Sequence, residues 1–282
     1  MHTILDILNL STDYLKQKGI ERSRRQAEEL LSEALGIARM DLYLQFDRPL
    51  IDLELERCRN WLKRRGQGEP LSYISGNVEF LGCSLKVTQD VLIPRQETEI
   101  LAERITEELS TLALDGKVLW DVCCGSGCLG IAIKNRLPAL SVALSDISKD
   151  ALNVAKENAL RNEVIVEFFE GDLLNPFIGR KADFFICNPP YIAAREIPTL
   201  DVEVRKHEPL LALDGGDSGL DFYRRLALEL PNFLNPRGKV WMEIGTGQGK
   251  AVKELFQASC WKECNVELDW SGHERFFSLE IE

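Results

Sequence analysis

The stretch VLWDVCCGSGCLG, residues 118–130, decides the fold class of this sequence. Its first five residues are mostly apolar and predict a buried strand, which runs into a glycine turn and then into a helix. Gly125, Gly127 and Gly130 satisfy the pattern G-x-G-x-x-G, whose backbone can approach a bound nucleotide closely. Asp146 follows about twenty residues later, at the end of the next predicted strand, as in a dinucleotide-binding fingerprint. The stretch therefore predicts a nucleotide-binding α/β fold.

The same rhythm of strand, turn and helix continues along the chain after Gly116. Strands are predicted at residues 117–122, 142–145, 164–169, 184–187 and 239–244, with helices between them, notably at 149–161 and 219–229. This alternation is typical of a mostly parallel, doubly wound sheet of the Rossmann-like class. Two last apolar stretches, 265–268 and 275–281, have no helix between them and predict an antiparallel edge.

The chain before this α/β region has a different character. Residues 1–75 show helical apolar periodicity and predict a small helical bundle, a domain suited to docking a substrate. Residues 76–94 predict a β-hairpin linker, and residues 95–282 form the predicted α/β domain. Residues 1–76 hold 12 basic and 12 acidic side chains, so the net charge of -11 comes from the rest of the chain. This asymmetry supports two domains with different surfaces.

Asp121 argues against a dinucleotide as the ligand of the glycine loop. Its carboxylate would stand where a pyrophosphate would otherwise meet a helix N-terminus, and like charges repel. The same carboxylate favours S-adenosylmethionine, which presents an amino group and a sulfonium, both positive. Asp146 is then placed to bind the ribose hydroxyls, and Gly171 and Asp172 to lie at the adenine edge. The alternatives are a turn-capping role for Asp121 and a helix N-cap role for Asp146.

The motif Asn188-Pro189-Pro190-Tyr191 follows an apolar strand and therefore lies at a carboxyl end of the predicted sheet, where open α/β folds place their sites. An amide or aromatic amine nitrogen is a poor nucleophile because its lone pair is delocalised. The Asn188 side-chain oxygen and the Pro189 carbonyl can accept its two N–H groups and leave the lone pair facing a sulfonium. Pro190 restricts the backbone, and Tyr191 offers a flat face to a planar group. The motif predicts methyl transfer to a planar nitrogen, with orientation as the main catalytic device.

Composition excludes several other classes. A net charge of -11 does not suit general attraction to DNA phosphates, so no direct DNA binding is expected. The eight cysteines contain no C-x-x-C pair, so neither a zinc site nor any other metal site is predicted. No apolar run reaches the roughly 20 residues that span a bilayer, and the N-terminus lacks the features of a signal peptide. The sequence therefore predicts a cytoplasmic protein without a membrane anchor.

Further motifs make the chain resemble one methyltransferase family, HemK/PrmC, the release factor glutamine methyltransferases. They are Glu69-Pro70, Tyr73-Ile74, Gly76, Glu79-Phe80, residues 92–99 (LIPRQETE), His207-Glu208-Pro209, residues 213–220 (LDGGDSGL) and Glu243-Ile244-Gly245 with Gln248. The resemblance covers nearly the whole chain. It implies a class I methyltransferase whose substrate is the glutamine of the Gly-Gly-Gln motif in class 1 peptide-chain release factors. It also implies that the helical domain grips the release factor.

The resemblance also implies a set of site residues. Asn188, Pro189, Pro190 and Tyr191 would hold the glutamine amide, and S-adenosylmethionine would be bound by Asp121, Cys123, Cys124, Gly125, Ser126, Gly127, Asp146, Asp172, Leu173 and Asn188. Residues 94–99 are expected to line the pocket. The chain departs from the family where glycine and a small polar residue are usual at positions 123 and 124, and where some members have an aromatic residue at 173. Cofactor binding is expected to survive these changes because Gly125 and Gly127 remain.

Three alternatives stay open at this point. A nucleic-acid methyltransferase acting on an adenine or guanine amine uses the same Asn-Pro-Pro-aromatic device, but it needs a basic path for phosphates. A non-catalytic interaction protein would use the helical bundle as its working part. A nicotinamide enzyme would use the glycine loop in its dinucleotide role.

Overall fold

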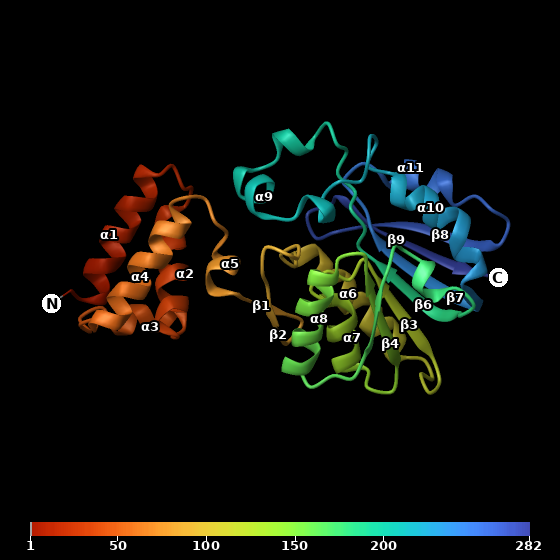
Figure 1. Cartoon of the computed structure of the whole chain (residues 1–282), viewed down its shortest axis with the longest axis horizontal. Coiled ribbons are helices and arrows are strands. Elements are labelled where there is room, and N and C mark those ends of the chain that lie inside the picture. The colour runs from red at the N-terminus through yellow and green to blue at the C-terminus, as the bar shows by residue number, and fades with distance from the viewer. Residues whose placement is uncertain (1) are drawn as a thin grey trace. The chain divides into compact units, whose positions relative to one another are not determined.

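The computed structural model describes residues 2–282, and its contacts divide the chain into two compact units (Figure 1). The first unit is the chain up to Gly76 together with Asp201–His207, and the second is Asn77–Leu200 together with Glu208–Glu282. The predicted hairpin thus belongs by its contacts to the second unit. None of the helices in residues 2–282 combines the length and apolar character that crossing a membrane requires.

The first unit consists of helices with their own core. They are α1 (Ile4–Gln17), α2 (Ser23–Leu35), α3 (Arg39–Leu44), α4 (Asp52–Arg65), α5 (Leu71–Ser75) and α9 (Val202–His207). Leu8, Leu30 and Leu31 are fully buried between α1, α2 and their neighbours. The guanidinium of Arg65, itself buried, pairs with Glu203. This ion pair lies within the unit and ties α9 to α4, although the two helices are far apart in the sequence.

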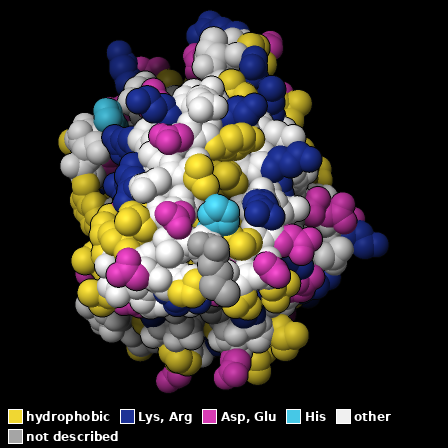
Figure 2. Space-filling view, turned by 90° about the vertical axis from the view of Figure 1, so that its left-hand side faces the viewer, with side chains coloured by type: hydrophobic (Ala, Val, Ile, Leu, Met, Phe, Trp, Pro, Cys, Tyr) yellow, Lys and Arg dark blue, Asp and Glu magenta, His cyan; other side chains and the backbone are white. Residues whose placement is uncertain are grey.

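Figure 2 shows helices α1 to α4 in space-filling form. Hydrophobic side chains are interspersed there with basic and acidic ones. The exposed large apolar residues of the helical unit are Leu10, Met40, Tyr43, Leu44, Ile51 and Leu53. The helical unit therefore presents apolar groups together with charges of both signs.

The second unit is built on a seven-stranded sheet in the order β5-β4-β3-β6-β7-β9-β8. Its strands are β3 (Val118–Val122), β4 (Ser141–Asp146), β5 (Glu167–Glu170), β6 (Ala182–Cys187), β7 (Leu234–Glu243), β8 (Trp261–Leu268) and β9 (Glu274–Ile281). The five strands from β5 to β7 in this order are parallel, and β9 and β8 are added as antiparallel strands at one edge. The predicted fold class is confirmed.

Helices cover both faces of this sheet (Figure 1). On one face pack α6 (Gln96–Ser110), α7 (Cys128–Arg136) and α8 (Lys149–Arg161), and on the other α10 (Asp221–Glu229) and α11 (Gly249–Leu255). Short 3-10 turns lie at Asn175–Phe177, Ile197–Thr199, Leu210–Ala212 and Leu230–Asn232. A separate hydrophobic core lies on each face of the sheet, and the side chains of β3 alternate between them. Leu119 packs in the core under α6, α7 and α8, and Trp120 and Val122 pack in the core under α10 and α11.

The strand order reverses at β3, which lies between β4 and β6. The parallel register pairs Val122, the last residue of β3, with Ser145 on one side and with Cys187 on the other. The glycine loop after β3 and the segment that starts with Asn188 after β6 therefore emerge side by side. This is the switch point at which doubly wound sheets form their ligand crevice.

A separate hairpin, β1 (Asn77–Phe80) and β2 (Cys83–Lys86), precedes α6. Asn158 of α8, which is fully buried, accepts a hydrogen bond from the Lys86 N–H at 2.6 Å and donates to the Lys86 carbonyl at 3.0 Å. Asn162 makes the same pair of contacts with the backbone of Ser84. Two asparagines one helical turn apart thus attach β2 to α8.

The strand predicted at residues 164–169 begins later than expected. Glu163 adopts a left-handed backbone with φ of 57°, and the Val164 N–H donates to the carbonyl of Ala159. Residues 163 and 164 therefore finish α8 in the manner of a helix C-terminus, and β5 starts at Glu167.

Candidate active site

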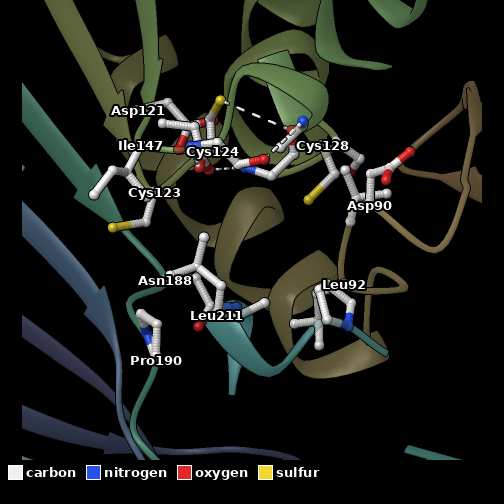
Figure 3. Close-up of a pocket in the computed structure, with 18 of the residues that line it drawn as sticks. Asp90, Leu92, Asp121, Cys123, Cys124, Cys128, Ile147, Asn188, Pro190 and Leu211 are labelled. Atoms are coloured by element: carbon white, nitrogen blue, oxygen red, sulfur yellow. Dashed lines mark hydrogen bonds between the residues drawn. The ribbon is translucent and has the colours of Figure 1, made fainter. Parts of the chain in front are cut away.

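A cavity of about 450 Å³ opens at the carboxyl ends of the central strands (Figure 3). In this view Asp121 and Cys124 lie across an open space from Asn188 and Leu211. The wall contains these predicted site residues: Asp121, Cys123, Cys124, Gly125, Ser126, Asp146, Asp172, Leu173, Asn188 and Pro190. Gly127, Pro189 and Tyr191 are not among the lining residues. The glycine loop and the segment after β6 thus meet at one cavity.

Left-handed backbone shapes the glycine loop. Cys123, Gly125 and Gly127 have φ values of 59°, 53° and 78°. At Gly127 an added Cβ would lie 2.7 Å from Ile131 and 2.8 Å from Leu144, which is too close for any side chain. Gly127 does not line the cavity, so its role is to let the turn pack closely against α7 and the sheet.

Asp121 places a carboxylate inside the protein. The residue is 1% exposed, and its Oδ2 accepts a hydrogen bond from the Gly130 N–H at 2.8 Å. Its Oδ1 is buried and has no hydrogen-bond partner within residues 2–282. Burial, reinforced by the nearby carboxylate of Asp146, raises the pKa of Asp121 to about 7, although the Gly130 N–H opposes the shift. A positively charged group near Oδ1 would satisfy both the open acceptor and the buried charge.

Asp146 ends β4 and holds the glycine loop in place. Its Oδ2 accepts from the Gly125 N–H at 2.8 Å, and its Oδ1 accepts from the Ser148 N–H at 2.9 Å. Burial raises the pKa of this carboxyl, and the backbone donors oppose that rise. The N-cap of α8 is Ser148, whose hydroxyl accepts from the Ala151 N–H. Each carboxylate oxygen of Asp146 has a second lone pair, so both can still accept from a ligand hydroxyl.

Asp172 forms an ion pair that the sequence did not predict. Both of its carboxylate oxygens accept hydrogen bonds from Arg225 of α10, at 2.9 and 2.8 Å. This bidentate contact fixes the orientation of the carboxylate and places Arg225 in the cavity wall. Leu173 follows with φ of 49° and is 3% exposed. Nothing in the sequence alone linked Arg225 with Asp172, because 53 residues separate them.

The amide of Asn188 is held from behind the cavity wall. Its Nδ2 donates to Oε2 of Glu243 at 3.0 Å and lies 3.3 Å from the hydroxyl of Thr98. No residue within 2–282 donates a hydrogen bond to Oδ1 of Asn188 or to the carbonyl of Pro189. Neither oxygen that the motif was expected to offer is therefore engaged within these residues, although only Asn188 lines the cavity.

Tyr191 is anchored through both its side chain and its backbone. Its hydroxyl donates to Oε1 of Glu243 at 3.1 Å, and its carbonyl accepts from the side chain of Gln248 at 2.9 Å. Burial raises the pKa of Tyr191, and the negative charge of Glu243 adds to the rise, so the phenol is a neutral donor. Gln248 also accepts from the Gly245 N–H and so connects the β7–α11 turn to the motif.

Other segments of the wall were not predicted to line the site. They include Gln89–Leu92, residues 147 and 148, and residues 209, 211 and 212, of which Leu92 and Pro209 stand in motifs that carried the family resemblance. Pro94 and Thr98, from the stretch 94–99 that was expected at the pocket, do line it. Ile147 and Leu211 are apolar yet 53% and 55% exposed. Its position directly after Asp146, at the carboxyl end of a predicted strand, could have identified Ile147 as a residue of the cavity wall.

An ion pair with one buried partner joins two of these wall segments. Arg95, just before α6, donates to Oε1 of Glu208 at 2.5 Å, and the Glu208 side chain is 1% exposed. Glu208 precedes Pro209 in the wall. The pair therefore holds the segment that follows α9 against the start of α6.

Comparisons with known proteins agree with this geometry. Residues 6–76 match the PrmC N-terminal domain, and residues 96–204 match the methyltransferase small domain. Release factor glutamine methyltransferases of Geobacter sulfurreducens and Chlamydia trachomatis are 40% and 42% identical over 97% of this chain, and the matches cover 95% and 93% of those relatives.

Among solved structures, a methyltransferase from Pyrococcus furiosus superposes with a TM-score of 0.51. The match covers 71% of this chain and 89% of that one at 16% identity, so this likeness concerns the fold alone. The relatives and the family matches together confirm the resemblance that the sequence motifs predicted.

Proposed function

This chain belongs to the release factor glutamine methyltransferase family, and on that premise we propose how it works. It transfers a methyl group from S-adenosylmethionine to the side-chain amide nitrogen of the glutamine in the Gly-Gly-Gln motif of class 1 peptide-chain release factors. The observation that carries the proposal is the position of Asn188, which lines the same cavity as Asp121 and whose Oδ1 accepts no hydrogen bond from residues 2–282.

The residues present fit S-adenosylmethionine. The partnerless Oδ1 of Asp121 suits a cationic ligand, and it repels a pyrophosphate. Asp146 retains acceptor capacity for ribose hydroxyls. The exposed apolar side chains of Ile147 and Leu211 suit the faces of an adenine ring. When bound, the cofactor supplies a methyl group on a sulfonium, which needs no further activation.

The motif after β6 orients the substrate amide. Oδ1 of Asn188 and the carbonyl of Pro189 accept its two N–H groups, which directs the nitrogen lone pair away from both acceptors. Pro189 and Pro190 restrict the backbone and hold this carbonyl in place. Tyr191 supports the site through its ring and through its anchored carbonyl. No acid–base residue is required of the chain, because orientation supplies the acceleration.

The helical unit is assigned the grip on the release factor. It carries exposed apolar side chains among charges of both signs, a composition suited to a protein surface (Figure 2). The acidic charge of the α/β region disfavours nucleic acid as the substrate. The place of action is the cytoplasm, where peptide-chain release occurs.

The proposal is tested by methyl transfer from labelled S-adenosylmethionine to a purified class 1 release factor. Label is expected on the native factor, and none on a factor whose Gly-Gly-Gln glutamine is changed to alanine. Enzyme carrying Asn188→Ala serves as the second control and should bind the cofactor yet transfer little. Label that appears on RNA or DNA and not on the factor would refute the glutamine assignment.

A further inference from the structure

We propose that Glu243 is a positioning residue for methyl transfer, whose buried carboxylate sets the orientation of the Asn188 amide so that Oδ1 faces the substrate. The inference rests on the proposed function and goes beyond it, because Glu243 does not line the cavity and would act on the substrate only through Asn188.

The sheet places Glu243 directly behind the motif. Glu243 is the last residue of β7, and the parallel register pairs the preceding Met242 with Cys187, the last residue of β6. Glu243 therefore stands beside Asn188, the residue after β6. The backbone carbonyl of Glu243 accepts from the hydroxyl of Tyr223 at 2.7 Å, and Tyr223 is fully buried. The position of Glu243 is thus determined by the sheet and by α10 together.

Three donors converge on the Glu243 carboxylate, which is 1% exposed. Oε2 accepts from the hydroxyl of Thr98 at 2.6 Å and from Nδ2 of Asn188 at 3.0 Å, and Oε1 accepts from the hydroxyl of Tyr191 at 3.1 Å. Two of these donors, Asn188 and Tyr191, belong to the motif that handles the substrate amide. A single buried carboxylate therefore supports both of them.

An ionised carboxylate can only accept hydrogen bonds, and this makes the orientation of Asn188 unambiguous. With the amide turned by 180°, Oδ1 would face the carboxylate of Glu243, and the two acceptors would repel each other. The NH2 group would then meet the N–H groups of the substrate, donor against donor. The carboxylate thus excludes the orientation in which Asn188 cannot bind the substrate.

The same contact strengthens Oδ1 as an acceptor. A hydrogen bond to a charged group polarises the amide that donates it, and this shifts electron density toward the amide oxygen. The oxygen is then better matched to the N–H groups of a nitrogen that gains positive charge during transfer. Glu243 acts on this step through Asn188.

Structural need alone does not account for Glu243. It takes part in none of the ion pairs found among residues 2–282. Burial raises its pKa, although the hydrogen bonds from Thr98 and Tyr191 and the charge of Arg275, which forms no ion pair with it, oppose the shift. By contrast Asp183, at the other end of β6, is 9% exposed and pairs with Lys117 at 2.9 Å. A buried carboxylate without a cationic partner destabilises a fold. Such a group is more readily explained by the site that it serves.

Asp183 offers a matched control for the test. Its carboxylate, like that of Glu243, accepts three hydrogen bonds, from the Lys117 side chain, the Val118 N–H and the Asn235 side chain. It lies near the amino end of β6, whereas the cavity is at the carboxyl ends of the strands. Asp183→Asn therefore disturbs a comparable network without touching Asn188.

The experiment measures single-turnover methyl transfer to a purified class 1 release factor, with the Kd of S-adenosylmethionine from calorimetry as a check on folding. Glu243→Gln is expected to slow transfer by about 10- to 100-fold, the usual loss when a supporting contact to a functional side chain is removed. The Kd should change by less than about threefold, because ground-state binding does not depend on the contact. Asp183→Asn should transfer at the wild-type rate once corrected for the folded fraction.

A double variant separates positioning from general destabilisation. If Glu243 acts mainly through Asn188, then adding Glu243→Gln to Asn188→Ala should slow transfer by no more than Tyr191→Phe does, because the hydroxyl of Tyr191 is the other motif group that Glu243 holds. If Glu243→Gln fails to fold, Glu243→Asp keeps the charge but withdraws it by one methylene, and a loss of rate at unchanged Kd is again expected.

Several results would overturn the inference. They are wild-type transfer by a folded Glu243 variant, losses that multiply in the double variant, and an equal loss per folded molecule in Asp183→Asn. Wild-type enzyme that labels no release factor would instead refute the proposed function. The two failures are therefore distinguishable.

Discussion

Asp121→Asn removes the charge of a buried side chain in the cavity wall while keeping its shape. The asparagine oxygen can still accept from the Gly130 N–H, so the turn after β3 should persist. The variant is expected to bind S-adenosylmethionine more weakly at pH 8 and to lose the pH dependence of binding that originates at this carboxyl. The loss at pH 8 should be about 10- to 100-fold, the usual value of a hydrogen bond to a charged group.

The pH dependence of the wild-type enzyme follows from its raised pKa. Because burial raises the pKa of Asp121 to about 7, a cationic ligand must displace a proton below that pH. About one-tenth of the carboxyl is ionised at pH 6 and about nine-tenths at pH 8, so cofactor affinity should fall about tenfold between pH 8 and pH 6.

Stability without ligand should change in the opposite direction. The folded pKa of Asp121 lies above its model value of 3.8, so the folded state holds a proton that the unfolded state releases. The free energy of unfolding of the wild-type enzyme therefore falls as pH rises from about 4 to about 7, by at most about 4 kcal/mol from this group. Asp121→Asn should be more stable than wild type at pH 8, and the difference should vanish near pH 4.

Calorimetry with S-adenosylmethionine and urea unfolding, each at pH 5, 6, 7 and 8, would measure both effects. Wild-type affinity in the asparagine variant at pH 8 would refute the electrostatic role of Asp121. An affinity that falls equally with pH in both proteins would assign the titration to another group, with Asp146 as the nearest carboxyl.

Four further substitutions test three separate parts of the structure. Gly127→Ala should lower the free energy of unfolding by about 3 kcal/mol in urea, because its Cβ would lie 2.7 Å from a side chain of α7. Gly125→Ala has nothing within 4 Å of its Cβ and should cost about 1 kcal/mol, so equal losses would contradict the packing argument. Asn158→Ala should lower the free energy of unfolding by about 3 kcal/mol, because it removes the hydrogen bonds that attach the hairpin to α8. It should also weaken cofactor binding in calorimetry, because the hairpin leads into the cavity wall at Gln89–Leu92. Unchanged binding would show that this wall is positioned independently of Asn158. Tyr191→Phe keeps the ring and loses the hydroxyl, so single-turnover transfer should slow by less than about tenfold at unchanged cofactor Kd, and a loss equal to that of Asn188→Ala would contradict the assigned roles.

Signals that act over a few residues located one helix correctly and one strand start wrongly. The helix predicted at residues 149–161 has those bounds in the structure, since Ser148 caps it and its apolar residues recur at helical spacing. The predicted start of β5 was wrong. Val164 and its neighbours are apolar and β-branched, which predicts a strand, but Val164 follows the left-handed turn at Glu163 that ends α8. Apolar alternation alone does not show where a helix gives way to a strand.

The site was predicted in its parts, and the structure supplied the connections between them. The glycine loop and Asn188 could be placed at one edge because parallel strands present their carboxyl ends together. Two side-chain pairs could not be predicted from the sequence, because the partners come from separate elements. They are Asp172 with Arg225 and Arg95 with Glu208. Glu243 was noted as part of a motif, but its contact with Asn188 depends on the register between β6 and β7.

By itself, then, the sequence determined the α/β class, and it predicted the ligand chemistry of Asp121 and the acceptor role of Asn188, because each depends on residues close together in the chain. Only the tertiary structure decided which of these groups are satisfied and which remain open. The Oδ1 of Asp121 has no partner within residues 2–282, and Nδ2 of Asn188 is engaged by Glu243. Burial and hydrogen bonding between distant segments arise when the sheet forms, so no local pattern encodes them.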